Sequence, residues 1–260
     1  MIGIVQGRLT DFKNKNLLQK FPKNYISEFE KASIIGFNFI EIFTEKKFNK
    51  KNPVWFIEGR NNYVNLSKKY NLKLISIIDE YSICNSINNK EYFYYFQNLL
   101  KSIRELKIKK LIIPLYKKSL VNKKNYKHFS KSLSKMAKAC YKYNIELLIE
   151  ADITFNFFLN LKKHKNIYFL YDTGNRYKFQ NPDLDILDFG KNIKHIHIKD
   201  KNINGKNVPL GTGVVNFKKI FKALKKISYK GDYVFETTRM NNSIITAKKN
   251  ILFLKRILKK

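Results

Sequence analysis

The amino-acid sequence predicts an α/β protein whose 260 residues form a single (β/α)₈ TIM barrel. Eight short runs rich in β-branched and aromatic residues alternate along the chain with longer lysine-rich stretches that carry apolar residues at helical spacing. No internal repeat, low-complexity linker or change of charge divides the chain. Barrels of this type run to about 250 residues without splitting, so we expect one domain over residues 1–260.

The eight runs are predicted to be strands buried on both faces, because they are nearly continuous in apolar residues. They are residues 2–6, 38–43, 72–78, 110–114, 145–150, 167–171, 193–199 and 233–236. Strands that alternate with helices form parallel sheets, and a count of eight favours a closed barrel. The main alternative is an open doubly wound sheet, which would carry Gly-x-Gly-x-x-Gly after its first strand. Gly3 and Gly7 bracket that strand without this pattern.

Helices are expected between these strands. One has Glu28, Phe29, Ala32 and Ile35 at helical spacing and ends at Gly36, where glycine can adopt the left-handed conformation that closes a helix. Further helices are expected at residues 55–70, 91–106, 124–143, 217–227 and 243–258. The pattern over residues 151–165 is less regular.

The composition indicates a sizeable hydrophobic core and a reducing compartment. Apolar residues make up 44% of the sequence, which allows a core without disulfides or structural metal ions. Cys84 and Cys140 follow no pairing or metal-ligand spacing, which suggests buried thiols. The first residues lack the regions of a signal peptide, and no apolar run approaches the roughly 20 residues that span a bilayer. We expect a cytoplasmic protein without a membrane partner.

The formal net charge of +32 allows two interpretations. Clustered Lys and Arg gain affinity for phosphates by releasing counterions, so the charge could indicate nucleic-acid binding. The basic residues are instead mostly Lys and are dispersed among abundant Asn, Ile, Phe and Tyr, as an AT-rich coding sequence would give. This dispersion favours a compositional origin, and we expect no nucleic-acid partner.

Four side chains that can bind a metal ion lie at four successive predicted strands. Glu150 ends the fifth strand, Asp172 follows the sixth, His197 lies in the seventh and Glu236 ends the eighth. Functional side chains of such barrels gather at the carboxyl ends of the strands, so these four should converge. Any one of them alone would more simply be a salt-bridge carboxylate or a core histidine, but the set of four predicts a metal site. Its oxygen donors and single imidazole suit Mn²⁺, Mg²⁺ or Co²⁺ and also accept Zn²⁺.

Other strand ends supply weaker candidates. They are Gln6 and Arg8 after the first strand, Glu41 in the second, Asp79 and Glu80 after the third, and Lys199 and Asp200 at the seventh. Lys199 lies two positions after His197, on the same face of the strand, where it could meet an anionic substrate group. Glu41 could instead support the metal ligands or pair with a lysine of the barrel.

Short motifs follow one another along nearly the whole chain. They are Gly3-Ile-Val-Gln-Gly-Arg-Leu9, Phe21-Pro22 with Glu28 and Ala32, Gly36-Phe-Asn-Phe-Ile-Glu41, Asn52-Pro53, Ile149-Glu150, Asp172-Thr-Gly-Asn175, His195-Ile-His-Ile-Lys-Asp200, Leu210-Gly-Thr-Gly213 and Phe235-Glu236. Each motif is short, but their order and spacing are specific together. In this arrangement the sequence resembles the xylose isomerase-like barrel family, also described as the sugar phosphate isomerase/epimerase family.

The resemblance implies one divalent ion, most simply Mn²⁺, held by Glu150, Asp172, His197 and Glu236. It also implies that Glu150 and Glu236 are the acid and base that move a proton on opposite faces of a sugar. The expected substrate contacts are Gln6, Arg8, Glu41, Asp79, Asn175 and Lys199. Ketose 3-epimerases of the family often have a histidine where this chain has Asn175, and a Glu-x-x-Asn-Arg-x-Glu pattern where it has Glu150-Ala-Asp-Ile-Thr. These departures argue against free ketohexose 3-epimerisation.

We therefore expect a metal-dependent isomerase or epimerase that acts on a sugar or sugar phosphate by proton transfer through an enediolate. Arg8, Lys199 and Lys201 favour a phosphorylated or otherwise anionic sugar. One alternative is a DNA-repair phosphodiesterase of the endonuclease IV type, which shares the fold but needs several histidines for three metal ions, where this chain has four in all. A non-catalytic barrel is the other alternative. Family members are often dimers or tetramers, so a homo-oligomer is compatible with the resemblance.

Overall fold

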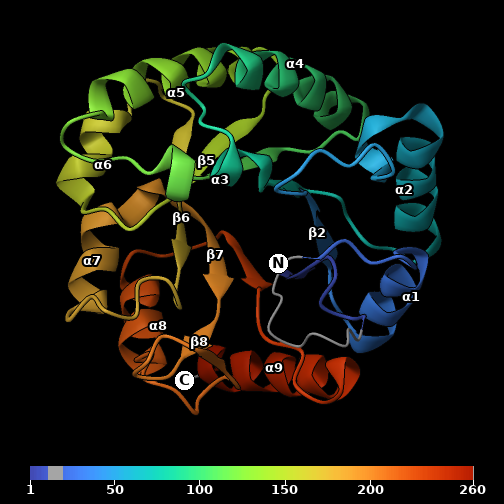
Figure 1. Ribbon diagram of the computed structural model, residues 1–260. Coiled ribbons are helices and arrows are strands. Elements are labelled where there is room, and N and C mark those ends of the chain that lie inside the picture. The colour runs from blue at the N-terminus through green and yellow to red at the C-terminus, as the bar shows by residue number, and fades with distance from the viewer. Residues whose placement is uncertain (11–19, 260) are drawn as a thin grey trace. The chain divides into compact units, whose positions relative to one another are not determined.

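The computed structural model describes residues 1–10 and 20–259. Within these residues, parallel strands form a closed barrel in the order β1-β10-β7-β6-β5-β4-β3-β2 (Figure 1). The barrel strands are β1 (Ile2–Val5), β2 (Phe39–Thr44), β3 (Ser76–Asp79), β4 (Lys110–Pro114), β5 (Glu146–Glu150), β6 (Ile167–Asp172), β7 (Ile193–Ile198) and β10 (Asp232–Phe235). The prediction of a (β/α)₈ barrel is confirmed, and the open doubly wound sheet is excluded.

Helices connect the strands. They are α1 (Ile26–Ile35), α2 (Ile57–Lys69), α3 (Tyr81–Cys84), α4 (Lys90–Glu105), α5 (Tyr126–Tyr141), α6 (Phe155–Leu161), α7 (Pro182–Phe189), α8 (Phe217–Lys226) and α9 (Ser243–Leu258), with the 3₁₀ turns η1 (Pro53–Trp55), η2 (Lys117–Ser119) and η3 (Gly190–Asn192). A small antiparallel hairpin joins β8 (Asp200–Lys201) to β9 (Asn207–Val208). As predicted, α1 ends at Gly36, whose φ of 94° lies in the left-handed region.

The predicted strand at residues 72–78 begins too early. The observed strand starts at Ser76, and Leu72, the first residue of the apolar run, closes the preceding helix instead. The Leu72 N–H donates to the Ser67 carbonyl at 2.9 Å, and the Ser67 hydroxyl donates to the Leu72 carbonyl at 2.5 Å. An apolar run alone does not distinguish a strand from a buried connection.

Helix α7 was not among the predicted elements, although it follows β6 where a barrel needs a helix. It has 8 residues, and its buried apolar side chains are Ile186 and Phe189, one helical turn apart. Two apolar residues at this spacing are too few to establish the helical period that would predict a helix from sequence. Pro182 occupies its first turn, a position that proline favours.

The first compact unit consists of Met1–Ile40 and Leu170–Lys260. In it β10 pairs in parallel with β1 and with β7, so that Ile4 lies opposite Phe235 and His197 lies opposite Val234. The carboxyl ends of these strands are therefore aligned, and the residues just after β10 lie beside the end of β7.

The second compact unit is Glu41–Phe169. Leu111 of β4 lies between Ile77 of β3 and Leu147 of β5, and all three side chains are fully buried. Helices α4 and α5 bury their own apolar faces, including Phe96 and Leu133. In the described part of the chain, no helix combines the length and the apolar character needed to cross a membrane.

Candidate metal centre

Hydrogen bonds between neighbouring strands position three of the predicted ligands in the first unit. The Glu236 N–H donates to the Ile198 carbonyl at 3.2 Å, so Glu236 lies beside the end of β7. The Thr173 N–H donates to the His197 carbonyl at 3.0 Å, so Asp172 ends β6 beside the same strand. Because side chains alternate between the two faces of a strand, His195 and His197 project on the same side of β7. Backbone pairing thus fixes where the three side chains meet.

Asp172, His197 and Glu236 form a compact cluster. The His197 Nδ1 atom lies 3.2 Å from Glu236 Oε2 and 3.9 Å from Asp172 Oδ2. All three side chains are buried, and one ligand atom from each lies within 4.8 Å of the others. Two carboxylates and one imidazole in this arrangement can share a cation.

A lysine ammonium already contacts both carboxylates. Lys199 Nζ lies 2.7 Å from Asp172 Oδ2 and 2.5 Å from Glu236 Oε2, and the residue is only 4% exposed. Arg8 Nη2 adds a longer contact to Glu236 Oε1, at 3.4 Å. Burial alone would raise the pKa of Glu236, but Lys199, His197 and Arg8 outweigh burial and hold this pKa well below its usual range. These cations therefore favour the ionised form of the Glu236 carboxyl.

The donor set fits a divalent ion. Carboxylate oxygens and an imidazole nitrogen are ligands of Mn²⁺, Mg²⁺, Co²⁺ and Zn²⁺. The Asp172 and Glu236 oxygens that face His197 are also the oxygens that bind the Lys199 ammonium. The same two oxygens therefore face both the imidazole and a positive charge.

The turn after β6 orients Asp172. Its Oδ1 atom accepts hydrogen bonds from the N–H groups of Gly174 and Asn175, each at 2.8 Å. Asn175 was predicted to contact substrate, and its backbone also holds the carboxylate whose other oxygen faces His197 and Lys199. A Cβ atom on Gly174 would lie 2.5 Å from the Lys199 Cβ atom, so glycine permits the close approach of Lys199.

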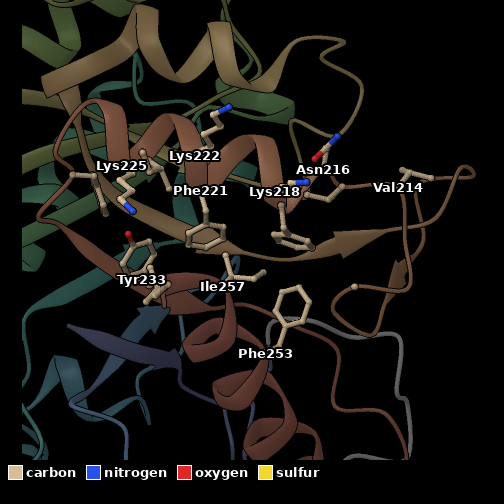
Figure 2. A pocket seen from close by; sticks show the side chains of 15 residues that line it. Val214, Asn216, Lys218, Phe221, Lys222, Lys225, Tyr233, Phe253 and Ile257 are labelled. Atoms are coloured by element: carbon tan, nitrogen blue, oxygen red, sulfur yellow. The ribbon is translucent and has the colours of Figure 1, made fainter. Parts of the chain in front are cut away.

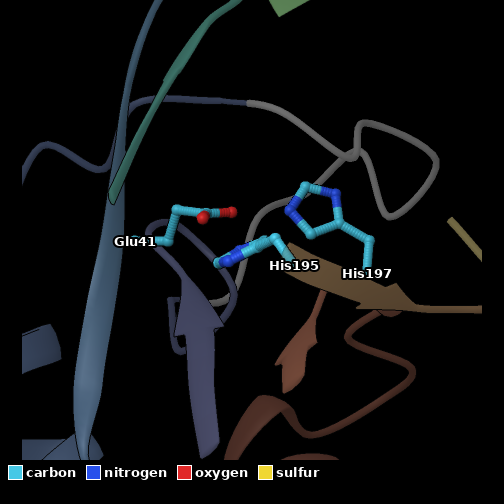
Figure 3. Close-up of side chains that lie close together, drawn as sticks. All are labelled: Glu41, His195 and His197. Atoms are coloured by element: carbon cyan, nitrogen blue, oxygen red, sulfur yellow. The ribbon is translucent and has the colours of Figure 1, made fainter. Parts of the chain in front are cut away.

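The remaining predicted site residues lie at or within barrel strands. Gln6 follows β1 and is buried, Glu41 lies inside β2 and is fully buried, and Glu150 ends β5 with 6% exposure. The Glu150 carbonyl accepts a hydrogen bond from the Leu115 N–H at 2.8 Å, which fixes the end of β5. Figure 3 shows His195 and His197 on β7 and Glu41 on β2.

Asp79 takes part in a dense hydrogen-bond network at the end of β3. Its Oδ1 atom accepts bonds from Thr44 Oγ1 at 2.8 Å and from the Tyr95 hydroxyl at 2.9 Å, and its Oδ2 atom accepts a short bond from the Tyr92 hydroxyl. Burial raises its pKa, while these donors lower it. These hydrogen bonds to both oxygens fix the orientation of the Asp79 carboxylate.

Asp200 organises the loop that follows β7. Its carboxylate accepts hydrogen bonds from the N–H groups of Gly211 and Gly213, each at 2.9 Å, and of Val215 at 3.3 Å. This loop begins directly after Lys199, so the carboxylate helps to hold the end of β7 in place.

We expect Asp200→Ala to lower the free energy of unfolding by about 1–3 kcal/mol, because it leaves backbone donors without their acceptor. Urea denaturation would measure the change. Asp188→Ala is a matched control, since Asp188 is an exposed residue of α7. Equal stability of the two variants would contradict this role of Asp200.

Glu28 was predicted as a helix residue and as part of a family motif without a site role, and it holds the loop that carries Arg8. Its carboxylate accepts hydrogen bonds from the N–H groups of Gly7 and Leu9 and from the Thr10 hydroxyl. The bond from Leu9 measures 3.0 Å and that from Thr10 measures 2.8 Å. Burial raises the pKa of Glu28, and these donors partly oppose the rise. The sequence signal was weak: an acidic residue next to buried Phe29 in an apolar helix face.

A separate apolar pocket lies in the first unit along α8 and α9. It has a volume of about 1130 Å³, and Phe221, Phe253 and Ile257 are among its lining residues (Figure 2). It shares no residue with the cluster of Asp172, His197 and Glu236. The predicted ligands therefore do not line this pocket.

The fold and the cluster together define a (β/α)₈-barrel protein with a carboxylate and histidine centre at the carboxyl ends of its strands. The family model described as Xylose isomerase-like TIM barrel matches residues 29–257, and the chain belongs to this family. No match was found among curated protein sequences.

Solved structures of sugar epimerases are similar to this chain. A D-psicose 3-epimerase from Clostridium cellulolyticum H10 has a TM-score of 0.79 at 17% identity, with 99% of both chains covered. An L-ribulose 3-epimerase has a TM-score of 0.76 at 16% identity, covering 99% of this chain and 94% of the other. A 3-keto-D-glucoside 4-epimerase from E. coli has a TM-score of 0.72 at 16% identity and 98% coverage of both. At these identities the likeness is one of fold.

Proposed function

We propose that this protein is a metal-dependent isomerase or epimerase that moves a proton between carbons of a sugar or sugar phosphate through an enediolate. The observation that carries the proposal is the buried cluster of Asp172, His197 and Glu236 at the carboxyl ends of three barrel strands. Functional residues of such barrels occupy this end. Sugar epimerases with the same fold give independent support for the reaction class.

We propose Glu150 as the fourth ligand. It ends β5, which neighbours β6 in the strand order, and Asp172 ends β6. The ends of neighbouring parallel strands share one edge of a sheet, which supports a common site. The resemblance of the Ile149-Glu150 motif to the family points to the same assignment.

Each residue has a proposed role in the reaction. A divalent ion, most simply Mn²⁺, would polarise the sugar carbonyl and acidify the adjacent C–H group. Glu236, whose buried carboxylate belongs to the cluster, would accept a proton from one face of the sugar. Glu150 would exchange a proton on the opposite face. Substrate contacts are proposed for Gln6, Arg8, Glu41, Asp79, Asn175 and Lys199.

Neutral and phosphorylated sugars deserve a direct comparison as substrates. A solved relative was crystallised with D-tagatose and another with D-allulose, both neutral sugars. The cations that favoured an anionic sugar have partners within the protein: Arg8 and Lys199 contact carboxylates, and Lys201 Nζ donates to the Gly205 carbonyl at 3.1 Å. These contacts weaken the case for a phosphate, so ketoses should be assayed before their phosphates.

The histidine positions favour this proposal over a trinuclear endonuclease. His128 is exposed on α5, and the His164 ring packs on Tyr141 with 5.5 Å between ring centroids. Neither belongs to a metal-competent group of the described residues. We propose a single cytoplasmic barrel domain that works on small molecules, alone or as a homo-oligomer.

Metal content is the first test. Purified wild-type protein should hold about one divalent ion per chain after loading with Mn²⁺, and His197→Ala and Glu150→Gln should each lose it. His128→Ala is the matched control and should keep the ion, since His128 lies on an outer helix. Wild-type protein that takes up no Mn²⁺ would refute the proposed function. Loss in His197→Ala but not in Glu150→Gln would restrict the site to the other three ligands.

A further inference from the structure

Lys199 occupies a position that the substrate-contact role does not explain. Its ammonium group contacts Asp172 at 2.7 Å and Glu236 at 2.5 Å, and both carboxylates are proposed metal ligands. Asp172 and Glu236 carry two negative charges, and Lys199 and Arg8 supply two positive charges within the first unit. The charges of these four groups therefore already balance without an ion.

The backbone holds Lys199 at this position. Thr173 Oγ1 donates to the Lys199 carbonyl at 2.7 Å and accepts from the Lys199 N–H at 2.9 Å. Gly174 leaves room for the first carbons of the lysine side chain, because a Cβ atom there would lie 2.5 Å from the Lys199 Cβ atom. Lys199 is thus positioned by the same turn that orients Asp172.

A metal ion and the ammonium group require the same oxygen atoms. The atoms that Lys199 contacts, Asp172 Oδ2 and Glu236 Oε2, are those that face His197 Nδ1. A divalent ion held by the same two oxygens would therefore lie close to the ammonium group. Two cations that close repel strongly in a buried site, so the ammonium group has to move away when the ion arrives.

We propose that Lys199 is a built-in counter-cation: it holds Asp172 and Glu236 together in the metal-free protein and is displaced when a divalent ion binds. This inference rests on the proposed function, because it assumes that the cluster binds metal. It means that Lys199 stabilises the metal-free fold and weakens metal binding. It also means that the ammonium group is freed beside the site only after the ion has bound.

The test compares Mn²⁺ binding and thermal stability without any sugar. Lys199→Met keeps most of the length of the side chain and removes its charge. Calorimetric titration should show Mn²⁺ binding about tenfold tighter or more, because no cation has to be displaced. In EDTA the variant should melt several degrees below wild type, since two buried carboxylates lose their partner. Saturating Mn²⁺ should raise its Tm by more than it raises that of wild type.

Two controls separate charge from general damage. Lys201→Met removes the lysine whose Nζ bonds to the Gly205 carbonyl, and it should bind Mn²⁺ as wild type does. Lys199→Arg keeps the charge and should remain close to wild type in both measurements. Lys199→Gln serves as a second neutral variant if Lys199→Met does not fold.

The outcomes distinguish this inference from the proposed function. If wild type binds Mn²⁺ and the neutral variants bind it no more tightly, the counter-cation role is wrong and the metal site stands. If neither wild type nor the neutral variants bind Mn²⁺, the proposed function fails and the displacement fails with it. Measurable Mn²⁺ binding in wild type, with tighter binding in the neutral variants, would support both the inference and the proposed function.

Discussion

Glu236→Gln is expected to lower kcat by about a thousandfold, because proton transfer by a positioned carboxylate contributes roughly 10²–10⁴ to a rate. Glutamine has nearly the same shape but can neither carry the negative charge nor accept the proton. The side chain is buried beside Lys199 and His197, so solvent cannot take over its role. This step is measured directly by the exchange of a sugar C–H with deuterated water, which NMR can monitor. Ketoses would be tested first and their phosphates second.

A matched control for Glu236→Gln is a glutamate at the amino end of a barrel strand. Glu146 begins β5, whereas the proposed catalytic groups lie at the carboxyl ends, so Glu146→Gln should leave the exchange rate near wild type. Circular dichroism of both variants would establish that the barrel is intact. Undiminished exchange in a folded Glu236→Gln variant would exclude Glu236 as the base.

Local sequence patterns were sufficient to predict the barrel. Runs such as residues 110–114 are apolar throughout because parallel strands are covered on both faces, and the observed β4 has the same bounds (Lys110–Pro114). The rule that function lies at strand ends selected Asp172, His197 and Glu236, which the structure brings together. The errors arose where local patterns are ambiguous: Leu72 closes a helix, and α7 buries only a short apolar stripe.

Contacts between distant segments could not be predicted in the same way. The alternation of side chains along β7 predicted that Lys199 and His197 lie on the same face of the strand. It did not show that the Lys199 ammonium group contacts two carboxylates. Arg8 and Glu236 are 228 positions apart, and only the pairing of β1 with β10 explains their contact. Glu28 gave no chemical signal because its partners are mostly backbone N–H groups, which are present at every residue but proline.

Glu28→Ala is expected to lower the free energy of unfolding by about 3 kcal/mol, because it leaves two buried backbone donors and a hydroxyl without their acceptor. For a chain of this length such a loss lowers Tm by about 6–12 °C. Turnover should also fall, since the loop of residues 7–10 carries Arg8, which contacts Glu236. Arg239, whose Nε donates to the Gly7 carbonyl at 2.7 Å, would remain to hold the loop partly in place.

The pH dependence gives a second signature of Glu28. Burial raises its pKa in the folded protein above the value in the unfolded chain. The contribution of Glu28 to folding stability is then complete below its pKa in the unfolded chain. It declines as the pH rises through its pKa in the folded protein. The stability difference between wild type and Glu28→Ala should therefore be larger near pH 4 than at pH 7. Glu30→Ala, an exposed change in the same helix, should show neither effect. If both variants unfold alike at every pH, Glu28 does not hold the Arg8 loop.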